Sequence, residues 1–321
     1  MKVFITGASG YIGNSLCREI SLKFPEWKIF GTDLKPPQSQ IANENFNFSI
    51  LNIVNREEVV RTIQSFQPDS IVHLASILNP PPGMSEEIQR SIDVDGTKNV
   101  LDSAIQAKTE QVIITSSGAA YGYHRDNPDW LRESDPIRGH HAFAYSIHKK
   151  EVESLMEDYK KSNPQLKQLI LRPGTVLGKT VNNLITDLFK KPVVMGISGS
   201  QSPFVFIWDE DVIQIILKGI QEKKEGIYNL AGDGALSLKE IADYLGKTYL
   251  PLPAGLVSTS LAILHKLRLS QYGPDQIDFL RYRPVLLNEK LKSEFGYTPK
   301  YTSKEAFFEF LNAKGMKIHA N

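Results

Sequence analysis

The sequence has little of several features that would place it in a special class of protein. Its 321 residues contain one cysteine, Cys17, so no disulfide can form within the chain, which fits a reducing compartment. Lys and Arg number 37 and Asp and Glu 36, so the net charge of +1 gives no basic surface for nucleic acid. Hydrophobic residues at 41% exclude extensive disorder.

Long apolar runs are missing as well. No stretch reaches the ~18 uncharged apolar residues of a membrane-spanning helix. The most apolar stretch, residues 253–264, is interpreted as an amphipathic helix that covers a pocket or a partner, with a membrane surface as the less favoured alternative. The first residues, MKVFITG, have too short an apolar run for a signal peptide, so a cytoplasmic protein is expected.

The first half of the sequence alternates short apolar runs with helical patterns. Strands are predicted at residues 2–6, 27–33, 46–51, 70–74 and 111–115. Helices are predicted at residues 11–23, 56–66, 85–108 and 145–160. This alternation indicates an α/β domain with a doubly wound parallel sheet and right-handed crossovers.

A glycine-rich segment, TGASGYIG, joins the first predicted strand to the first predicted helix. Its spacing is G-x-x-G-x-x-G, and glycine lets the backbone approach a pyrophosphate at the positive end of the following helix. The position between strand and helix favours a dinucleotide-binding loop over a turn without a ligand. The predicted cofactor contacts in this loop are Gly7, Ser9, Gly10, Tyr11, Ile12 and Gly13.

Asp33 ends the second predicted strand, and 33 − 13 places it 20 residues after Gly13. A carboxylate at this spacing hydrogen-bonds the adenosine ribose and repels the 2′-phosphate of NADP. NAD is therefore the predicted cofactor, and the nearby Lys35 would weaken the preference. A turn residue without a ligand is the alternative interpretation of Asp33.

The sequence after residue 174 is less regular. Residues 204–208 and 226–230 are predicted strands around a helix at 210–221, and the remainder is interpreted as helical segments and loops. We predict a Rossmann domain that binds NAD, residues 1–175 and 204–232, and a smaller, partly discontinuous substrate-binding lobe, residues 176–203 and 233–321. Ligands of open α/β sheets bind beyond the carboxyl ends of the strands, so a cleft between the two is expected.

Tyr145 and Lys149 have the spacing Tyr-x-x-x-Lys within a predicted helix. Residues four apart share a helix face, and an ammonium beside a phenol stabilises the phenolate and lowers its pKa. The pair can therefore act as acid or base at a secondary alcohol. Upstream, Ser116 and Ser117 follow a predicted strand, where a serine hydroxyl could hold the substrate oxygen.

Taken together, these motifs resemble those of the extended short-chain dehydrogenases/reductases, in their NAD-dependent epimerase/dehydratase-like branch. The matching segments, in family order, are TGASGYIG, Asp33, HLAS, SSGAAYG, YSIHK, LRPG and YNLAG, with LKSEFGYTP near the end. Each motif is weak by itself, and their combination over residues 1–232 makes the resemblance specific.

The resemblance implies roles for individual residues. Tyr145 would be the general acid/base, Lys149 would hold the phenolate and the nicotinamide ribose, and Ser117 would be the catalytic hydroxyl. The further implied cofactor contacts are Asn52, Ile53, Leu74, Ala75, Ser76, Tyr145, Lys149 and Pro173. Asn52 and Asp93 depart from the family pattern, which has Asp and Asn at these positions, and Asp93 is expected to buttress a loop.

The sequence leaves the substrate open. The family's arginine that clamps a diphosphate is missing from residues 200–206, and the only later arginines are Arg268, Arg281 and Arg283. Arg281 and Arg283 are the candidates for a diphosphate contact, and Ser117 and Tyr145 would contact the reacting part of the substrate. A sugar nucleotide and an epimerase-type reaction are therefore weighed against an apolar alcohol or ketone, as in 3β-hydroxysteroid dehydrogenases.

A dinucleotide-sensing protein without turnover is the third alternative. Such relatives commonly lack the Tyr–Lys pair, which this chain keeps. Gly118 and Ala119 stand where 4,6-dehydratases have Asp and Glu, which disfavours dehydration. His73 is expected to make strand-end hydrogen bonds rather than act as a base. No metal site is expected at His140 and His141. The resemblance also implies a homodimer formed by the helices at 85–108 and 145–160.

Overall fold

The computed structural model describes residues 1–81, 83–267 and 273–319. The chain divides into two compact units, each made of several segments. The first contains Met1–Ser117, Ile147–Arg172 and Glu210–Tyr228, and the second contains Gly118–Ser146, Pro173–Asp209 and the chain from Asn229 onward. The predicted cofactor domain and substrate lobe are defined by the ligands that each would bind, so this division stays a prediction.

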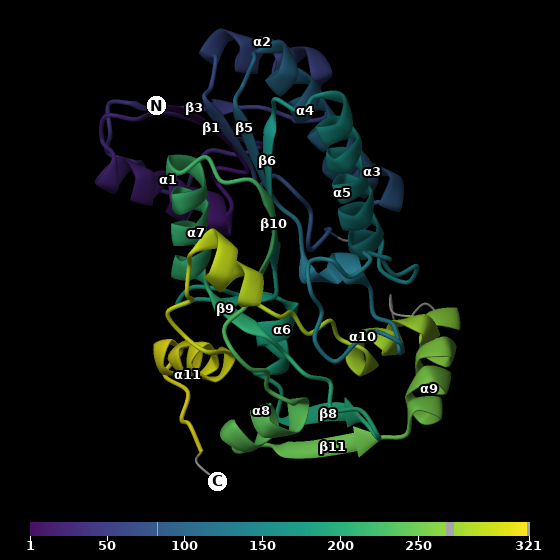
Figure 1. Cartoon of the computed structure of the whole chain (residues 1–321). Coiled ribbons are helices and arrows are strands. Elements are labelled where there is room, and N and C mark those ends of the chain that lie inside the picture. Colours follow the sequence, from purple (N-terminus) through teal and green to yellow (C-terminus); the bar gives the residue numbers. More distant parts are fainter. Residues whose placement is uncertain (82, 268–272, 320–321) are drawn as a thin grey trace. The chain divides into compact units, whose positions relative to one another are not determined.

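A seven-stranded sheet forms the framework of the first unit (Figure 1). Its order is β10-β6-β5-β4-β1-β2-β3, and the pairs from β6 through β3 are parallel. The strands are β1 (Lys2–Thr6), β2 (Lys28–Asp33), β3 (Phe46–Ile50), β4 (Ser70–His73), β5 (Gln111–Thr115), β6 (Lys167–Pro173) and β10 (Gly226–Leu230). This parallel sheet confirms the predicted fold class. The strand order reverses between β1 and β4, and doubly wound sheets bind their ligands at such a point.

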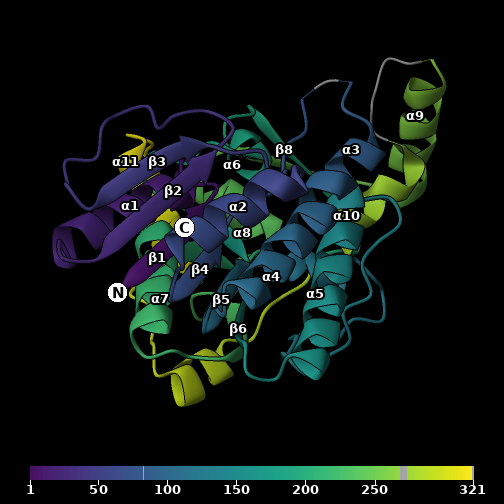
Figure 2. The ribbon, with the colours of Figure 1, turned by 90° about the horizontal axis from the view of Figure 1, so that it is seen from above.

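Helices cover both faces of this sheet. Figure 2 shows α2 (Arg56–Phe66), α4 (Gly96–Gln106) and α5 (Ala144–Ser162) on one face, with α1 (Tyr11–Lys23) and α7 (Asp209–Gln221) on the other. Apolar residues at helical spacing bury the first face, among them Val59, Ile63, Val100, Leu101, Val152 and Met156. Asn55 caps α2, because its side chain accepts a hydrogen bond from the N–H of Glu58.

The long helix predicted at 85–108 is present, with one interruption that the sequence did not indicate. It consists of α3 (Glu86–Arg90), a π-helical turn at Ser91–Asp95 and α4. A π-turn inserts an extra residue into the helix and re-aims the side chains around it, and such turns are frequent at functional sites. Asp93 stands in the middle of this one.

The second unit contains two small parallel strand pairs and several helices. Strand β7 (Thr175–Leu177) pairs with β9 (Phe206–Trp208), and β8 (Val193–Ile197) pairs with β11 (Thr248–Leu252). The helices are α6 (Leu184–Leu188), α8 (Leu238–Tyr244), α9 (Ala254–Lys266), α10 (Ile277–Arg281) and α11 (Ser303–Ala313). Strands β8 and β11 were not predicted, since each is short, partly exposed and stabilised by a partner distant in sequence.

The apolar stretch at 253–264 forms α9, as the sequence predicts. Among the residues that the structure describes, no helix combines the length and the apolar character needed to cross a membrane.

Candidate functional site

The glycine loop between β1 and α1 has a backbone packed too closely for side chains. Gly7 has a φ of +69°, which favours glycine, and a Cβ on it would lie 2.7 Å from the nitrogen of Ala75. A Cβ on Gly13 would lie 2.1 Å from the carbonyl oxygen of Gly7. Both positions therefore require glycine so that the loop, α1 and the segment after β4 can meet.

Helix α1 begins at this loop, and its N-terminus has no side-chain cap in the described structure. Gly10 precedes the helix and offers no side-chain cap, and no acidic residue stands in the first turn of this described helix. The N–H groups and the positive dipole end are suited to an anion such as a pyrophosphate. The predicted contacts Ser9, Gly10, Tyr11, Ile12 and Gly13 all lie at this helix start.

Asp33 ends β2 and its carboxylate holds the glycine loop. The oxygen Oδ2 accepts from the N–H of Ser9 at 3.0 Å, and Oδ1 accepts from the N–H of Leu34 at 2.7 Å. The hydroxyl of Ser9 donates to the carbonyl oxygen of Lys35 at 2.6 Å. The carboxylate is thus fixed beside the loop, where a ribose-binding acid is needed.

The implied cofactor contacts Asn52 and Ile53 lie in a short loop after β3. Asn52 Oδ1 accepts from the N–H of Val54 at 3.1 Å, and the carbonyl oxygen of Ile53 accepts from Asn99 Nδ2 at 2.9 Å. The side chain of Ile53 packs under Gly96, where a Cβ would lie 2.6 Å from Ile53 Cδ1. The loop is therefore held by α4, and its contact with the cofactor stays a prediction.

Buried hydrogen bonds connect the ends of β1 and β4 to the start of α4. Thr6 Oγ1 accepts from the N–H groups of Leu74 and Ala75 at 3.2 and 3.3 Å, so its own proton is directed to His73 Nδ1, 2.7 Å away. His73 Nε2 then carries the ring proton and donates to Thr97 Oγ1 at 2.9 Å. Both ring nitrogens are engaged in the fold.

Burial, with the nearby Lys149, lowers the pKa of His73 to about 3. The imidazole is therefore neutral at pH 7, in agreement with its two hydrogen bonds to threonine hydroxyls. The expectation that His73 makes strand-end hydrogen bonds is confirmed. The backbone of Ala75, two residues after His73, packs against Gly7 of the glycine loop.

The two serines after β5 have different surroundings. Ser116 is buried, and its hydroxyl donates to Glu153 Oε1 at 2.5 Å. Arg172 donates to the same carboxylate through Nη2 at 2.6 Å and Nε at 2.9 Å. Ser117 is partly exposed just beyond the strand. The engagement of Ser116 supports Ser117 as the catalytic hydroxyl, which stays a prediction.

Tyr145 and Lys149 stand one turn apart at the start of α5. Tyr145 is partly exposed, and Lys149 is 5% exposed. The ammonium of Lys149 donates to the carbonyl oxygen of Thr115 at 3.1 Å. Burial lowers the pKa of Lys149, and the charges of Asp93 and Glu153 oppose that shift. A buried ammonium one turn from a phenol is the arrangement that the spacing predicts.

The pairing of Glu153 with Arg172 was missed from the sequence. Both side chains are almost fully buried, at 2% and 3% exposure. The available signal was spacing, because Tyr145, Lys149 and Glu153 recur every four residues and so share one face of α5. The contact of His148 with Asp93 was missed as well, because it joins α5 to the π-turn and no local pattern indicates which residues of two segments will meet.

Arg283, in the second unit, has an unusual setting for a cation. Its guanidinium stacks on the rings of Phe204 and Phe279, at 3.9 and 4.6 Å from their centroids. Burial lowers its pKa to about 10. Its Nη1 is buried without a hydrogen-bond partner among the described residues. The residues 200–206 lack an arginine, but the fold brings Arg283 against Phe204 of that segment.

The other predicted substrate and cofactor positions are less distinctive. The guanidinium of Arg281 lies over the ring of Tyr282, 4.7 Å from its centroid, and Pro173 is the last residue of β6. Arg268 lies outside the described residues. His140 and His141 approach two different carboxylates, Asp278 at 3.6 Å and Asp275 at 3.7 Å. No group of three or more potential metal ligands occurs within the described ranges.

The sequence from residue 3 to residue 231 matches the family model described as "NAD dependent epimerase/dehydratase family". The chain belongs to this family. The match includes the glycine loop, Asp33, Ser117 and the Tyr145–Lys149 pair, so the predicted resemblance is confirmed. NAD is the cofactor that membership assigns, and the start of α1, which has no side-chain cap, fits the pyrophosphate of NAD through its N–H groups.

Known proteins resemble the chain over nearly its whole length. An uncharacterized protein of Mycobacterium tuberculosis is 19% identical over 316 residues, which are 98% of this chain and 84% of that protein. The UDP-glucose 4-epimerase of Thermotoga maritima, solved with UDP-glucose, superposes with a TM-score of 0.75 at 17% identity, covering 98% of this chain and 99% of that one. The dTDP-glucose 4,6-dehydratase of Bacillus anthracis, solved with NAD, gives 0.72 at 18%, covering 98% and 96%. At these identities the structures show the fold.

Titration should show tighter binding of NAD than of NADP, because the carboxylate of Asp33 is fixed beside the glycine loop and repels a 2′-phosphate. The Asp33→Ala variant should narrow the difference between the two Kd values, as measured by calorimetry. Asp69→Ala, which changes an acid of the same unit after α2, is the matched control and should keep the wild-type ratio. Tighter binding of NADP by the wild type would refute the assignment of Asp33.

Proposed function

We propose that this protein is an NAD-dependent oxidoreductase that moves hydride at a secondary alcohol or ketone carbon of a sugar nucleotide, in an epimerase-type reaction. The observation that carries the chemistry is the buried ammonium of Lys149, one turn from the partly exposed Tyr145 on α5. NAD, when bound, supplies the acceptor and donor of hydride. The remaining steps fall to the protein's own side chains.

Tyr145 acts as the acid and base. As the alcohol is oxidised, the phenolate of Tyr145 takes the hydroxyl proton, and it returns the proton when the ketone is reduced. The ammonium of Lys149 stabilises the phenolate by its charge, and the hydrogen bond to the carbonyl oxygen of Thr115 holds the ammonium in place. The hydroxyl of Ser117 holds the reacting oxygen of the substrate. Ser116 is occupied by Glu153 and takes no part.

Arg283 supports a diphosphate-containing substrate. A buried guanidinium nitrogen without a partner is costly, and a phosphate oxygen would satisfy it while restoring charge balance. Among the described residues no carboxylate pairs with Arg283, whereas Arg132 of the same unit is paired with Glu289 at 2.8 Å. The stacking of Arg283 between two phenylalanines also holds its planar fork in one orientation.

An apolar alcohol or ketone is the second candidate substrate. The observation that favours it is the aromatic cluster around Arg283, in which Tyr123, Phe143 and Phe279 pack at 5.0–5.1 Å between ring centroids. A sensor without turnover is disfavoured because Ser117, Tyr145 and Lys149 are all present.

We also propose that the protein is located in the cytoplasm.

A homodimer is proposed from the family resemblance, through α5 and the helical segment from α3 to α4. Sedimentation at micromolar protein concentration is expected to give a species of about twice the 36.0 kDa chain. A single species of the mass of one chain would contradict it.

Calorimetric titration of the NAD-loaded protein with UDP and with UDP-glucose tests the substrate class. We expect micromolar binding of UDP, weakened at least about tenfold by Arg283→Met, because a charge-assisted bond to phosphate is lost. Methionine keeps an apolar stem between Phe204 and Phe279. Arg281→Ala tests the second candidate arginine in the same way.

Arg132→Ala is the matched control, since this arginine already has a carboxylate partner and should not affect UDP binding. No detectable UDP binding, together with NADH-dependent reduction of a hydrophobic ketone, would reject the sugar nucleotide in favour of the apolar substrate.

A further inference from the structure

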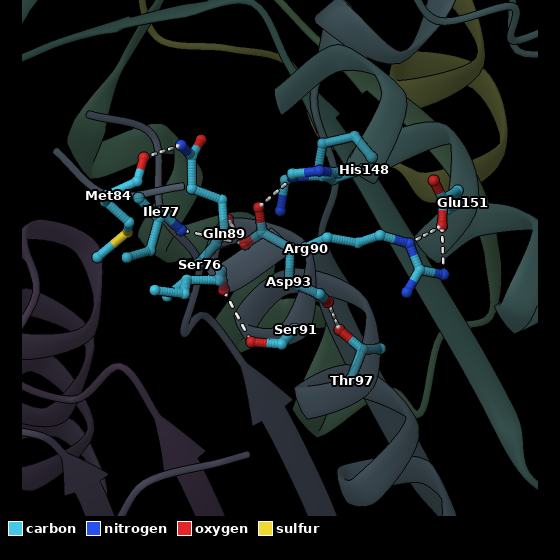
Figure 3. A network of polar contacts seen from close by, with 12 residues as sticks. Ser76, Ile77, Met84, Gln89, Arg90, Ser91, Asp93, Thr97, His148 and Glu151 are labelled. Atoms are coloured by element: carbon cyan, nitrogen blue, oxygen red, sulfur yellow. Dashed lines mark hydrogen bonds and ion pairs between the residues drawn. The ribbon is translucent and has the colours of Figure 1, made fainter. Parts of the chain in front are cut away.

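The π-helical turn Ser91–Asp95 directs one buried carboxylate at two other parts of the first unit (Figure 3). The side chain of Asp93 has no exposed surface. Its Oδ1 accepts from the hydroxyl of Ser76 at 2.7 Å and from the N–H of Ile77 at 3.1 Å, and Oδ2 lies 3.3 Å from His148 Nδ1. The loop of residues 74–77, which follows β4, and helix α5 are therefore tied to one side chain.

These contacts determine the proton positions. A carboxylate only accepts, and hydrogen bonds and the charge of Lys149 outweigh burial to lower the pKa of Asp93. Asp93 is therefore ionised at neutral pH. His148 must then carry a proton on Nδ1, the nitrogen that faces Oδ2. The bond thus sets the tautomer of a ring that is itself 4% exposed.

The two groups that Asp93 joins both belong to the proposed chemistry. The 74–77 loop contains the predicted cofactor contacts Ala75 and Ser76, and Ala75 backs onto Gly7. His148 immediately precedes Lys149 on α5. The backbone of Asp93 is held as well, since its carbonyl oxygen accepts from Thr97 Oγ1 at 2.5 Å.

We propose that Asp93 and His148 form a positioning pair, which fixes the cofactor loop 74–77 relative to Lys149 and keeps a negative charge beside its ammonium. This inference rests on the proposed function for the role of Lys149. Neither residue is assigned contact with substrate or cofactor. The pair acts through the loop and through the helix that bears the lysine.

The charged and titratable groups around Lys149 come from several elements. Asp93 on the π-turn and Glu153 on α5 supply negative charge, and Glu153 is itself paired with Arg172 of β6. His73 of β4 is neutral at pH 7, and His148 is bonded to Asp93. Burial lowers the pKa of Lys149, and the charge of Asp93 raises it. Removing that charge should therefore lower the pKa of Lys149 further.

The test uses the full-length protein with Asp93→Asn, Asp93→Ala and, as matched control, Asp95→Asn. Asp95 belongs to the same turn, but its side chain is 53% exposed and forms an ion pair with Arg90 at 3.5 Å. Nitrogen-15 NMR reports the tautomer of His148, and carbon-13 NMR of labelled lysine, assigned with Lys149→Met, reports the pKa of Lys149. Calorimetry gives the Kd for NAD. None of these measurements needs a substrate.

In the wild type we expect the Nδ1–H tautomer of His148. In Asp93→Asn the amide oxygen must face the N–H of Ile77, so its NH₂ group faces His148, and the ring should switch to the Nε2–H tautomer. The pKa of Lys149 should fall in both Asp93 variants, and Asp93→Ala should weaken NAD binding roughly tenfold. Asp95→Asn should match the wild type in every measurement.

An Nε2–H tautomer of His148 in the wild type would overturn the proposal without any variant. So would Asp93→Asn with the wild-type tautomer of His148 and an unchanged pKa of Lys149. If Asp93→Ala does not fold, the spectra of Asp93→Asn and of the wild type still test the proposal. A protein with the expected spectra that turns over no sugar nucleotide would refute the proposed function and leave the positioning pair intact.

Discussion

Tyr145→Phe is expected to lower turnover by about 10²- to 10⁴-fold and to leave NAD affinity nearly unchanged. Phenylalanine keeps the ring at the start of α5 and removes only the hydroxyl that exchanges the proton. The measurements are the steady-state rate with the sugar nucleotide that binds and the Kd for NAD by calorimetry. Lys149→Met should reduce both quantities, because the lysine is assigned to the phenolate and to the nicotinamide ribose.

Tyr159→Phe is the matched control for this prediction. Tyr159 belongs to the same helix, where its hydroxyl bonds to Asp102, and it is not part of the proposed site. Its loss should leave turnover at the wild-type level. Near-wild-type turnover of Tyr145→Phe would remove this residue from the mechanism, whereas equal losses in both variants would indicate a general effect on the helix.

Glu153→Gln is expected to destabilise the protein by about 3–5 kcal/mol, because it removes one charge of a buried ion pair. Glu153 and Arg172 are 2.6 Å apart at their closest atoms and almost fully buried, and the hydroxyl of Ser116 bonds to the same carboxylate. The glutamine would leave the buried guanidinium without its neutralising partner. The change should appear in calorimetry as a fall in Tm of roughly 10 °C.

Glu151→Gln, two residues earlier on α5, serves as its control. This glutamate is 34% exposed and pairs with Arg90 at 2.7 Å, so its loss should cost no more than about 1 kcal/mol. A Tm for Glu153→Gln equal to that of Glu151→Gln would show that the buried pair adds nothing to stability. The mixed variant Glu153→Gln, Arg172→Met should recover part of the loss, since both charges are then absent.

Local patterns made much of the first unit predictable. The glycine spacing from Gly7 to Gly13 is a local motif, and the structure shows that neighbouring backbone atoms exclude a Cβ at both positions. Strand–helix alternation predicted the doubly wound sheet because crossovers of that length are compatible with few topologies. Asn55 caps α2 with its side chain, and capping of this kind depends on neighbouring residues only.

The second unit was less predictable because its strands depend on distant partners. Strand β8 is stabilised by β11, and the register pairs Val193 with Thr248. Short, half-exposed segments of this kind carry a weak periodic signal, so they were interpreted as loops and helices. The sequence could not show where Arg283 would lie, because it reaches Phe204 of the segment 200–206 from a remote part of the chain.

The sequence by itself determined the fold class, the family, the glycine loop and the Tyr145–Lys149 spacing, because each depends on residues near one another in the chain. Only the tertiary structure decided the surroundings of these residues. It buried Glu153 with Arg172, inserted the π-turn that aims Asp93 at Ser76 and His148, and stacked Arg283 between two rings. The physical reason is that a charge's environment depends on side chains brought from distant segments, and no local pattern records which of them will meet.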